Sequence, residues 1–153
     1  MGFEIVGLQP EKEVGKSFSN DVWYWRPLWG YIAETCWDIL SEEEIEQGTW
    51  NDGYEYSRTK AMKLARRLYE LLKSGKVDEW GRRYVRALDG LPDEKCSWCR
   101  GLASGELRKA RGKCSGCEGT GRTKPFVCSY RFSKDNVEAF AEFAEASGGF
   151  QVW

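Results

Sequence analysis

Histidine is absent from all 153 residues of the sequence, and methionine (2 residues) and proline (4 residues) are scarce. The lack of histidine removes the side chain that most often acts as a general base near neutral pH and as a ligand of catalytic zinc. The glycine patterns of nucleotide-binding loops and the nucleophile elbow of hydrolases are also missing. We therefore expect a protein that is not an enzyme. A hydrolase or transferase that uses carboxylates is an alternative whose catalytic residues the sequence does not place.

Long apolar runs are missing as well. No stretch of 18 apolar residues occurs, so we expect no membrane span and no membrane partner. The first residues lack the charged and apolar regions of a secretory signal, and we expect a cytoplasmic protein. Aromatic residues, in contrast, are plentiful, with 8 Trp, 7 Tyr and 7 Phe. The chain therefore has enough bulky apolar side chains to build a core.

The net charge of −1 conceals an uneven distribution along the chain. Residues 1–56 carry a net charge of −9, whereas residues 57–93 and 94–124 each carry +5, and residues 125–153 carry −2. A basic region of this kind can bind an anionic partner. It can also pair with the acidic N-terminal part of the same chain, and the sequence leaves both interpretations open.

The pattern of apolar residues predicts a mixture of helices and a few short strands. Three of the helical segments follow typical capping residues, Ser41, Ser57 and Ser133, and glycines end several of the segments. We predict helices at about 28–40, 42–47, 58–74, 77–88 and 134–146, strands at 3–8, 126–132 and 150–153, and a loop at 49–56. The predicted fold class is α+β, mostly helical, with an inserted zinc hairpin. Its core domain comprises residues 1–93 and 125–153, and its zinc-binding module comprises residues 94–124.

Two matched cysteine knuckles are the most informative motif of the chain. One is Cys96-Ser97-Trp98-Cys99-Arg100-Gly101, and the other is Cys114-Ser115-Gly116-Cys117-Glu118-Gly119-Thr120-Gly121. Two CxxC pairs at this spacing predict one structural zinc ion bound by four thiolates. A redox dithiol and an iron–sulfur site are the alternatives, and the presence of two matched pairs argues against the first. A site of four thiolates leaves no position for substrate, and no small-molecule cofactor is evident.

The second knuckle, with its pattern Cys114-x-x-Cys117-x-Gly119-x-Gly121, resembles the cysteine-rich repeat of DnaJ-type co-chaperones. The resemblance covers about residues 94–124 and implies a zinc hairpin with a single zinc ion. It does not imply chaperone activity, because the His-Pro-Asp motif of that family is absent. The whole chain also resembles a group of small bacterial and phage proteins without an assigned activity, through residues 22–29, the Asn51-Asp52-Gly53 loop, the knuckles and residues 146–150.

The residues around the knuckles are the candidate binding surface. We expect a protein partner, with nucleic acid as the alternative, because a basic zinc hairpin can also contact phosphates. The candidate residues are Trp98, Arg100, Arg108, Lys109, Arg111, Lys113 and Arg122. The segment 22–29, which is rich in tryptophan, is interpreted first as core and alternatively as a binding surface. Cys36 and Cys128 belong to neither knuckle, and we expect both to be buried and inert.

Overall fold

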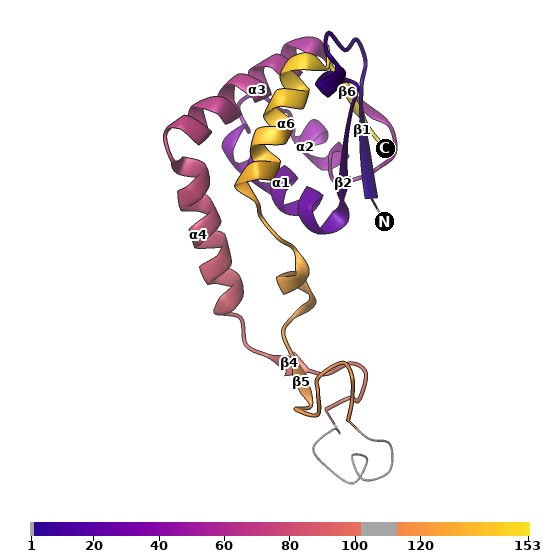
Figure 1. The fold of residues 1–153 in the computed structure, drawn as a ribbon, viewed down its shortest axis with the longest axis vertical. Helices are drawn as coiled ribbons and strands as arrows, with labels where there is room; N and C mark the ends of the chain where they lie inside the picture. Colours follow the sequence, from indigo (N-terminus) through magenta and orange to yellow (C-terminus); the bar gives the residue numbers. More distant parts are fainter. Residues whose placement is uncertain (1, 102–112) are drawn as a thin grey trace. The chain divides into compact units, whose positions relative to one another are not determined.

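The computed structural model describes residues 2–101 and 113–153 (Figure 1). Helices alternate with short antiparallel strands, which confirms the α+β class. The chain divides into two compact units: unit 1 comprises Met1–Val85 and Tyr130–Trp153, and unit 2 comprises Arg86–Ser129. Within the described ranges, no helix has both the length and the apolar character needed to cross a lipid bilayer.

A four-stranded antiparallel sheet forms one layer of unit 1. Its strands are β1 (Gly2–Gly7), β2 (Ser17–Asp21), β3 (Tyr54–Tyr56) and β6 (Phe150–Val152), in the spatial order β2-β1-β6-β3. Along β1, Phe3 and Ile5 are buried, whereas Glu4 and Val6 are exposed. Because successive side chains of a strand point to opposite faces, one face of the sheet forms part of the core and the other carries exposed side chains.

Capping side chains mark the start of four of the five α-helices described below. The helices are α1 (Val22–Thr35), α2 (Glu42–Gln47), α3 (Arg58–Lys73), α4 (Lys76–Asp89) and α6 (Lys134–Ala146). Asp21, Ser41, Ser57 and Ser133 each accept a hydrogen bond from a backbone amide in the first turn of the helix that follows. These bonds satisfy amides that have no partner inside the helix, which fixes the helix start. The capping box predicted for Ser41 and Glu44 is present.

Aromatic side chains form the centre of the core. Trp25 stacks on Trp29 and on Phe3, with ring centroids 5.4 Å apart in both pairs. Both indole N–H groups are satisfied, since Trp25 donates to the carbonyl of Gly48 at 2.9 Å and Trp29 to that of Ile45 at 2.8 Å. The segment 22–29 is therefore a core element at these two tryptophans.

Helix α1 differs from its prediction, because it begins at Val22 and ends at Thr35 instead of running from about 28 to 40. Pro27 lies inside the helix and cannot donate a hydrogen bond to the carbonyl of Trp23, four residues earlier. The amide of Arg131 donates to that carbonyl instead, at 2.8 Å. A contact from a distant segment thus compensates for the proline, and local sequence patterns contain no sign of it.

The strands differ most from the sequence predictions. Neither β2 nor β3 was predicted, because β2 contains one apolar residue, Phe18, and β3 has only three residues. The prediction of a strand at 126–132 was wrong: residues Phe126–Ser129 form a 3₁₀ helix, in which the amide of Cys128 donates to the carbonyl of Pro125. The final strand, β6, is present but lies in the interior of the sheet and not at its edge.

Candidate metal centre

Four cysteine sulfurs gather in unit 2. All four Sγ atoms lie within 4.8 Å of one another, and the pairs Cys96–Cys114 and Cys99–Cys117 are separated by 3.9 Å and 3.7 Å. Four sulfurs placed tetrahedrally about 2.3 Å from a zinc ion would be about 3.8 Å apart. The cluster therefore has the size of a four-coordinate metal site. Sequence reasoning paired the two knuckles correctly, and the structure brings all four predicted ligands together.

The backbone of each knuckle turns through a left-handed conformation directly after its second cysteine. Arg100 and Glu118 occupy equivalent positions and both have φ of 53°. The glycines that follow them, Gly101 and Gly119, have φ of 76° and 91°. Glycine adopts this conformation without a steric penalty, which explains why each knuckle contains a glycine two residues after its second cysteine.

These turns direct backbone amides toward sulfur. The amide of Gly121 donates to Sγ of Cys117 at 3.2 Å. Gly121 also lies where the knuckles meet, since a Cβ atom at this position would be only 3.0 Å from the carbonyl oxygen of Gly101. The second glycine of the CxGxG pattern thus has two roles, because it donates to a ligand and allows the two knuckle backbones to approach closely.

A short hairpin closes the module. Strand β4 (Glu94–Lys95) pairs with β5 (Arg122–Thr123), and the amide of Cys96 donates to the carbonyl of Gly121 at 2.9 Å. The hydroxyl of Thr120 donates to the carbonyls of Cys117 and Arg122, both at 2.9 Å. Sequence reasoning did not identify Thr120, although a threonine between the two glycines of the motif is a visible signal.

The protein environment acts on individual thiols. Burial alone would raise the pKa of Cys117, but amides of Gly121 and Gly119 donate to its sulfur and lower the pKa to about 6. Burial raises the pKa of Cys114. Cys96 and Cys117 are buried, whereas Cys99 and Cys114 are half-buried. A bound cation would favour the thiolate form of all four.

The four sulfurs are enough to complete the coordination of one tetrahedral ion. Four thiolates occupy all corners of a tetrahedral ion, so neither water nor substrate can coordinate. A divalent ion with four thiolates would carry a net charge of −2, and residues 94–124 carry a net charge of +5.

The predicted binding residues divide into three groups. Trp98, Arg100 and Lys113 are exposed, and the exposed fraction of Trp98 is 76%. Arg122 is also exposed, but its guanidinium donates to the carbonyl of Asp93 within unit 2. The remaining predictions, Arg108, Lys109 and Arg111, lie outside the described residues.

The indole of Trp98 lies against Gly116, a glycine that sequence reasoning did not single out. A Cβ atom at Gly116 would lie 2.9 Å from Cγ of the indole and 3.1 Å from Cδ2. The indole therefore packs over the backbone of the second knuckle while most of its surface stays exposed. A glycine between the cysteines of the second pair is the sequence signal for this contact.

The other two cysteines lie apart from the cluster. Cys36 is completely buried in the core of unit 1, and burial raises its pKa to about 11. Cys128 is half-buried, and its sulfur lies 3.6 Å from the carbonyl of Leu88. The prediction of a buried Cys36 is confirmed, and Cys128 is only partly shielded.

Comparison with known proteins did not identify a family. A scan against protein-family models, a search of curated proteins and a search of solved structures each found no match to this chain. The resemblance to the DnaJ-type repeat therefore depends on the cysteines and glycines of residues 94–124 alone. What the structure establishes is a four-cysteine cluster, formed by two CxxC knuckles, that could hold one metal ion.

Proposed function

We propose that the chain is a small zinc-binding accessory protein that acts by binding a protein partner and not by catalysis. The ion is zinc, because four thiolates in a tetrahedral arrangement are the preferred ligands of structural zinc. The module belongs to the class of zinc ribbons and hairpins that the CxxCxGxG pattern indicates, and a bacterial or phage protein is the context that the whole-chain resemblance favours. The observation that carries the proposal is the exposed Trp98 beside the four-cysteine cluster.

The position of Trp98 favours a protein contact. Tryptophan is enriched at the centres of protein interfaces, where a rigid aromatic side chain buries a large area at little entropic cost. The indole lies against the backbone at Gly116, so less side-chain freedom is lost when a partner covers it. The zinc ion would stabilise the knuckle that carries this side chain.

A capture experiment with matched variants tests this role. Trp98→Ala removes the proposed contact, and Trp37→Ala is the control, because Trp37 is 71% exposed in unit 1. We expect a partner that wild-type protein and Trp37→Ala retain and that Trp98→Ala loses. If both variants recovered every partner equally well, Trp98 would not be part of the contact between the module and its partners.

Nucleic acid is the second candidate, and the exposed cations Arg100 and Lys113 favour it. Binding to phosphates weakens steeply as salt increases, whereas a hydrophobic protein contact does not. Fluorescence anisotropy of labelled single- and double-stranded DNA and RNA across a salt series separates the two candidates. Binding that falls linearly with the logarithm of salt concentration, and that weakens when Arg108, Lys109 and Arg111 are replaced by alanine, would replace the protein-partner proposal.

A further inference from the structure

The sheet of unit 1 has one outer strand of ordinary length without lysine or proline. The two outermost strands are β2 and β3, and β3 has only three residues. Strand β2 has five residues, Ser17–Asp21, and contains neither lysine nor proline. Proteins commonly protect sheet edges with short strands, lysine or proline, and β2 has none of these features.

The register shows which backbone groups of β2 point outward. Glu4 and Trp153 exchange two backbone hydrogen bonds, of 2.7 Å and 2.8 Å, so the amide and carbonyl of Glu4 point toward the β6 side. Ser19 is opposite Glu4 in β2. Because these directions alternate along an antiparallel pair, the amide and carbonyl of Ser19 point away from β1. In the part of the chain that the structure describes, no further strand pairs with β2.

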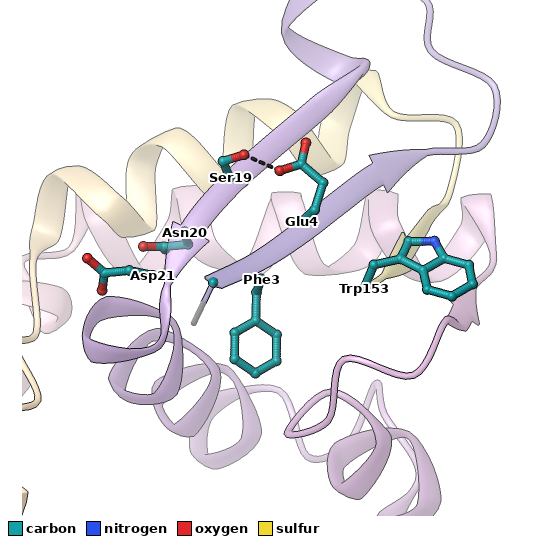
Figure 2. Close-up of a pocket in the computed structure, with 7 residues that line it drawn as sticks. Phe3, Glu4, Ser19, Asn20, Asp21 and Trp153 are labelled. Atoms are coloured by element: carbon teal, nitrogen blue, oxygen red, sulfur yellow. Dashed lines mark hydrogen bonds between the residues drawn. The ribbon is translucent and has the colours of Figure 1, made fainter.

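An acidic hollow lies beside this edge, at the end of the sheet where β1 begins and β2 ends (Figure 2). Its volume is about 610 Å³, and its lining residues include Glu4, Asp21 and Trp153. Figure 2 shows the side chains of Asp21 and Trp153 pointing away from each other, on opposite sides of Glu4. Gly2 also lines it and contributes no side chain. No lysine or arginine is among the lining residues.

The two carboxylates have only neutral partners among the described residues. Glu4 accepts a hydrogen bond from the hydroxyl of Ser19. Asp21 accepts from the amides of Trp23 and Tyr24 at the start of α1. Neither carboxylate forms an ion pair in the described ranges. This end of the sheet therefore carries negative charge that complements a cation.

We propose that unit 1 binds an extended, basic segment of a partner protein, which adds a strand to β2 and inserts a lysine or arginine side chain into this hollow. A residue paired with Ser19 would point its side chain to the same face as Glu4. Strands lie about 4.8 Å apart, so that residue would be about 10 Å from Glu4, across two strand spacings. A lysine or arginine side chain lying over Ser19 reaches the Glu4 carboxylate, and the added strand would satisfy the backbone of Ser19.

The test uses a fluorescein-labelled peptide of eight residues that alternates lysine and valine, titrated with the full-length protein. A matched peptide of glutamate and valine and a small cation, spermine, are the comparison probes. We expect the lysine peptide to bind and the glutamate peptide not to bind. We also expect that spermine at equal charge concentration does not displace the bound lysine peptide. Displacement by spermine would overturn the proposal that the occupant is a polypeptide strand.

Charge-neutral variants locate the contact. Glu4→Gln keeps the size of the side chain, and Asp21→Asn keeps a side chain that caps helices well. Each should weaken peptide binding about fivefold or more, as expected for the loss of one charge-assisted contact. Glu55→Gln is the control, because Glu55 is exposed on the same face of the sheet, opposite Gln151, and outside the hollow. Equal weakening by Glu55→Gln, or no weakening by Glu4→Gln, would refute the proposal.

This site is separate from the metal centre, so the two proposals fail independently. Cys114→Ser removes a predicted metal ligand in unit 2 and leaves every residue of the hollow in place. We expect this variant to bind the lysine peptide with unchanged affinity. Loss of peptide binding in Cys114→Ser, with unit 1 still folded by circular dichroism, would contradict a site that unit 1 forms alone.

Discussion

Removal of the metal should unfold the cysteine module and leave the core of unit 1 intact. The reason is that the only buried cluster in the described part of unit 2 consists of the cysteines themselves. Ordering the roughly 20 described residues between positions 94 and 124 costs about 20 kcal/mol at ~1 kcal/mol per residue. Burial of four thiols returns only about 4 kcal/mol. A structural zinc ion contributes about 10–16 kcal/mol, which is the size of the difference.

Two-dimensional ¹H–¹⁵N NMR during chelation measures this directly. The amide of Gly121 reports on the module because it donates to Sγ of Cys117, and its resonance should move to a random-coil position. The indole resonances of Trp25 and Trp29 report on unit 1 and should stay unchanged, because both donate to carbonyls within its core. Added zinc should restore the first spectrum. An unchanged Gly121 resonance after complete metal removal would refute the reasoning.

Three further predictions concern unit 1. Gly48→Ala should destabilise it by about 1–3 kcal/mol or more in urea unfolding, because the new Cβ atom would lie 2.0 Å from a core indole. Gly30→Ala should instead stabilise helix α1 by about 0.5–1 kcal/mol, because a Cβ atom at Gly30 would lie in open space. If the free energy of unfolding changed with the same sign in both variants, the described packing at these two glycines would be contradicted. Burial alone would raise the pKa of Glu44. The ammonium of Lys60, together with backbone and side-chain hydrogen bonds from Ser41, lowers this pKa below its unfolded value of about 4.3. The contribution of Glu44 to stability should therefore be present above the unfolded pKa and disappear as pH falls through the folded pKa. A thermal-unfolding difference between wild type and Glu44→Gln that persists unchanged at pH 2 would contradict this sign. Cys36 should resist alkylation at pH 8 until unit 1 unfolds, because burial raises its pKa to about 11. Rapid labelling of Cys36 in the native protein, detected by mass spectrometry, would show that this thiol is not buried.

Sequence patterns predicted the features that depend on local chemistry. The cluster of four cysteines followed from cysteine and glycine spacing, and the helices that start after Ser41, Ser57 and Ser133 followed from capping residues. In these cases the residues that determine the structure are close together in the chain. A single window of sequence therefore contains enough information to place them.

Features that depend on distant contacts were missed. Helix α1 continues through Pro27 because Arg131, more than 100 residues later, donates to the carbonyl that the proline leaves unpaired. Strand β2 exists because of its pairing with β1, since Phe18 is its only apolar residue. The acidic hollow depends on the same pairing, because the register brings Ser19 beside Glu4. No local pattern could reveal these contacts.

The binding surface of the module was predictable only in part. Trp98 was a candidate because it lies between two cysteines, and its exposure agrees with that interpretation. The contact that holds its indole against Gly116 requires the two knuckles to meet, which the spacing alone does not describe. Arg122 shows the opposite case, because its charge suggested an external partner but its guanidinium donates to the carbonyl of Asp93.

The most direct test of the central claim is the metal itself. Protein purified under reducing conditions should contain one zinc ion per chain, and X-ray absorption at the zinc edge should show four sulfur neighbours at about 2.3 Å. Cys114→Ser should lose most of this zinc, and Cys36→Ser should keep it, because Cys36 lies outside the cluster. Protein that binds no metal, or a metal coordinated by nitrogen or oxygen atoms, would contradict a centre formed by Cys96, Cys99, Cys114 and Cys117.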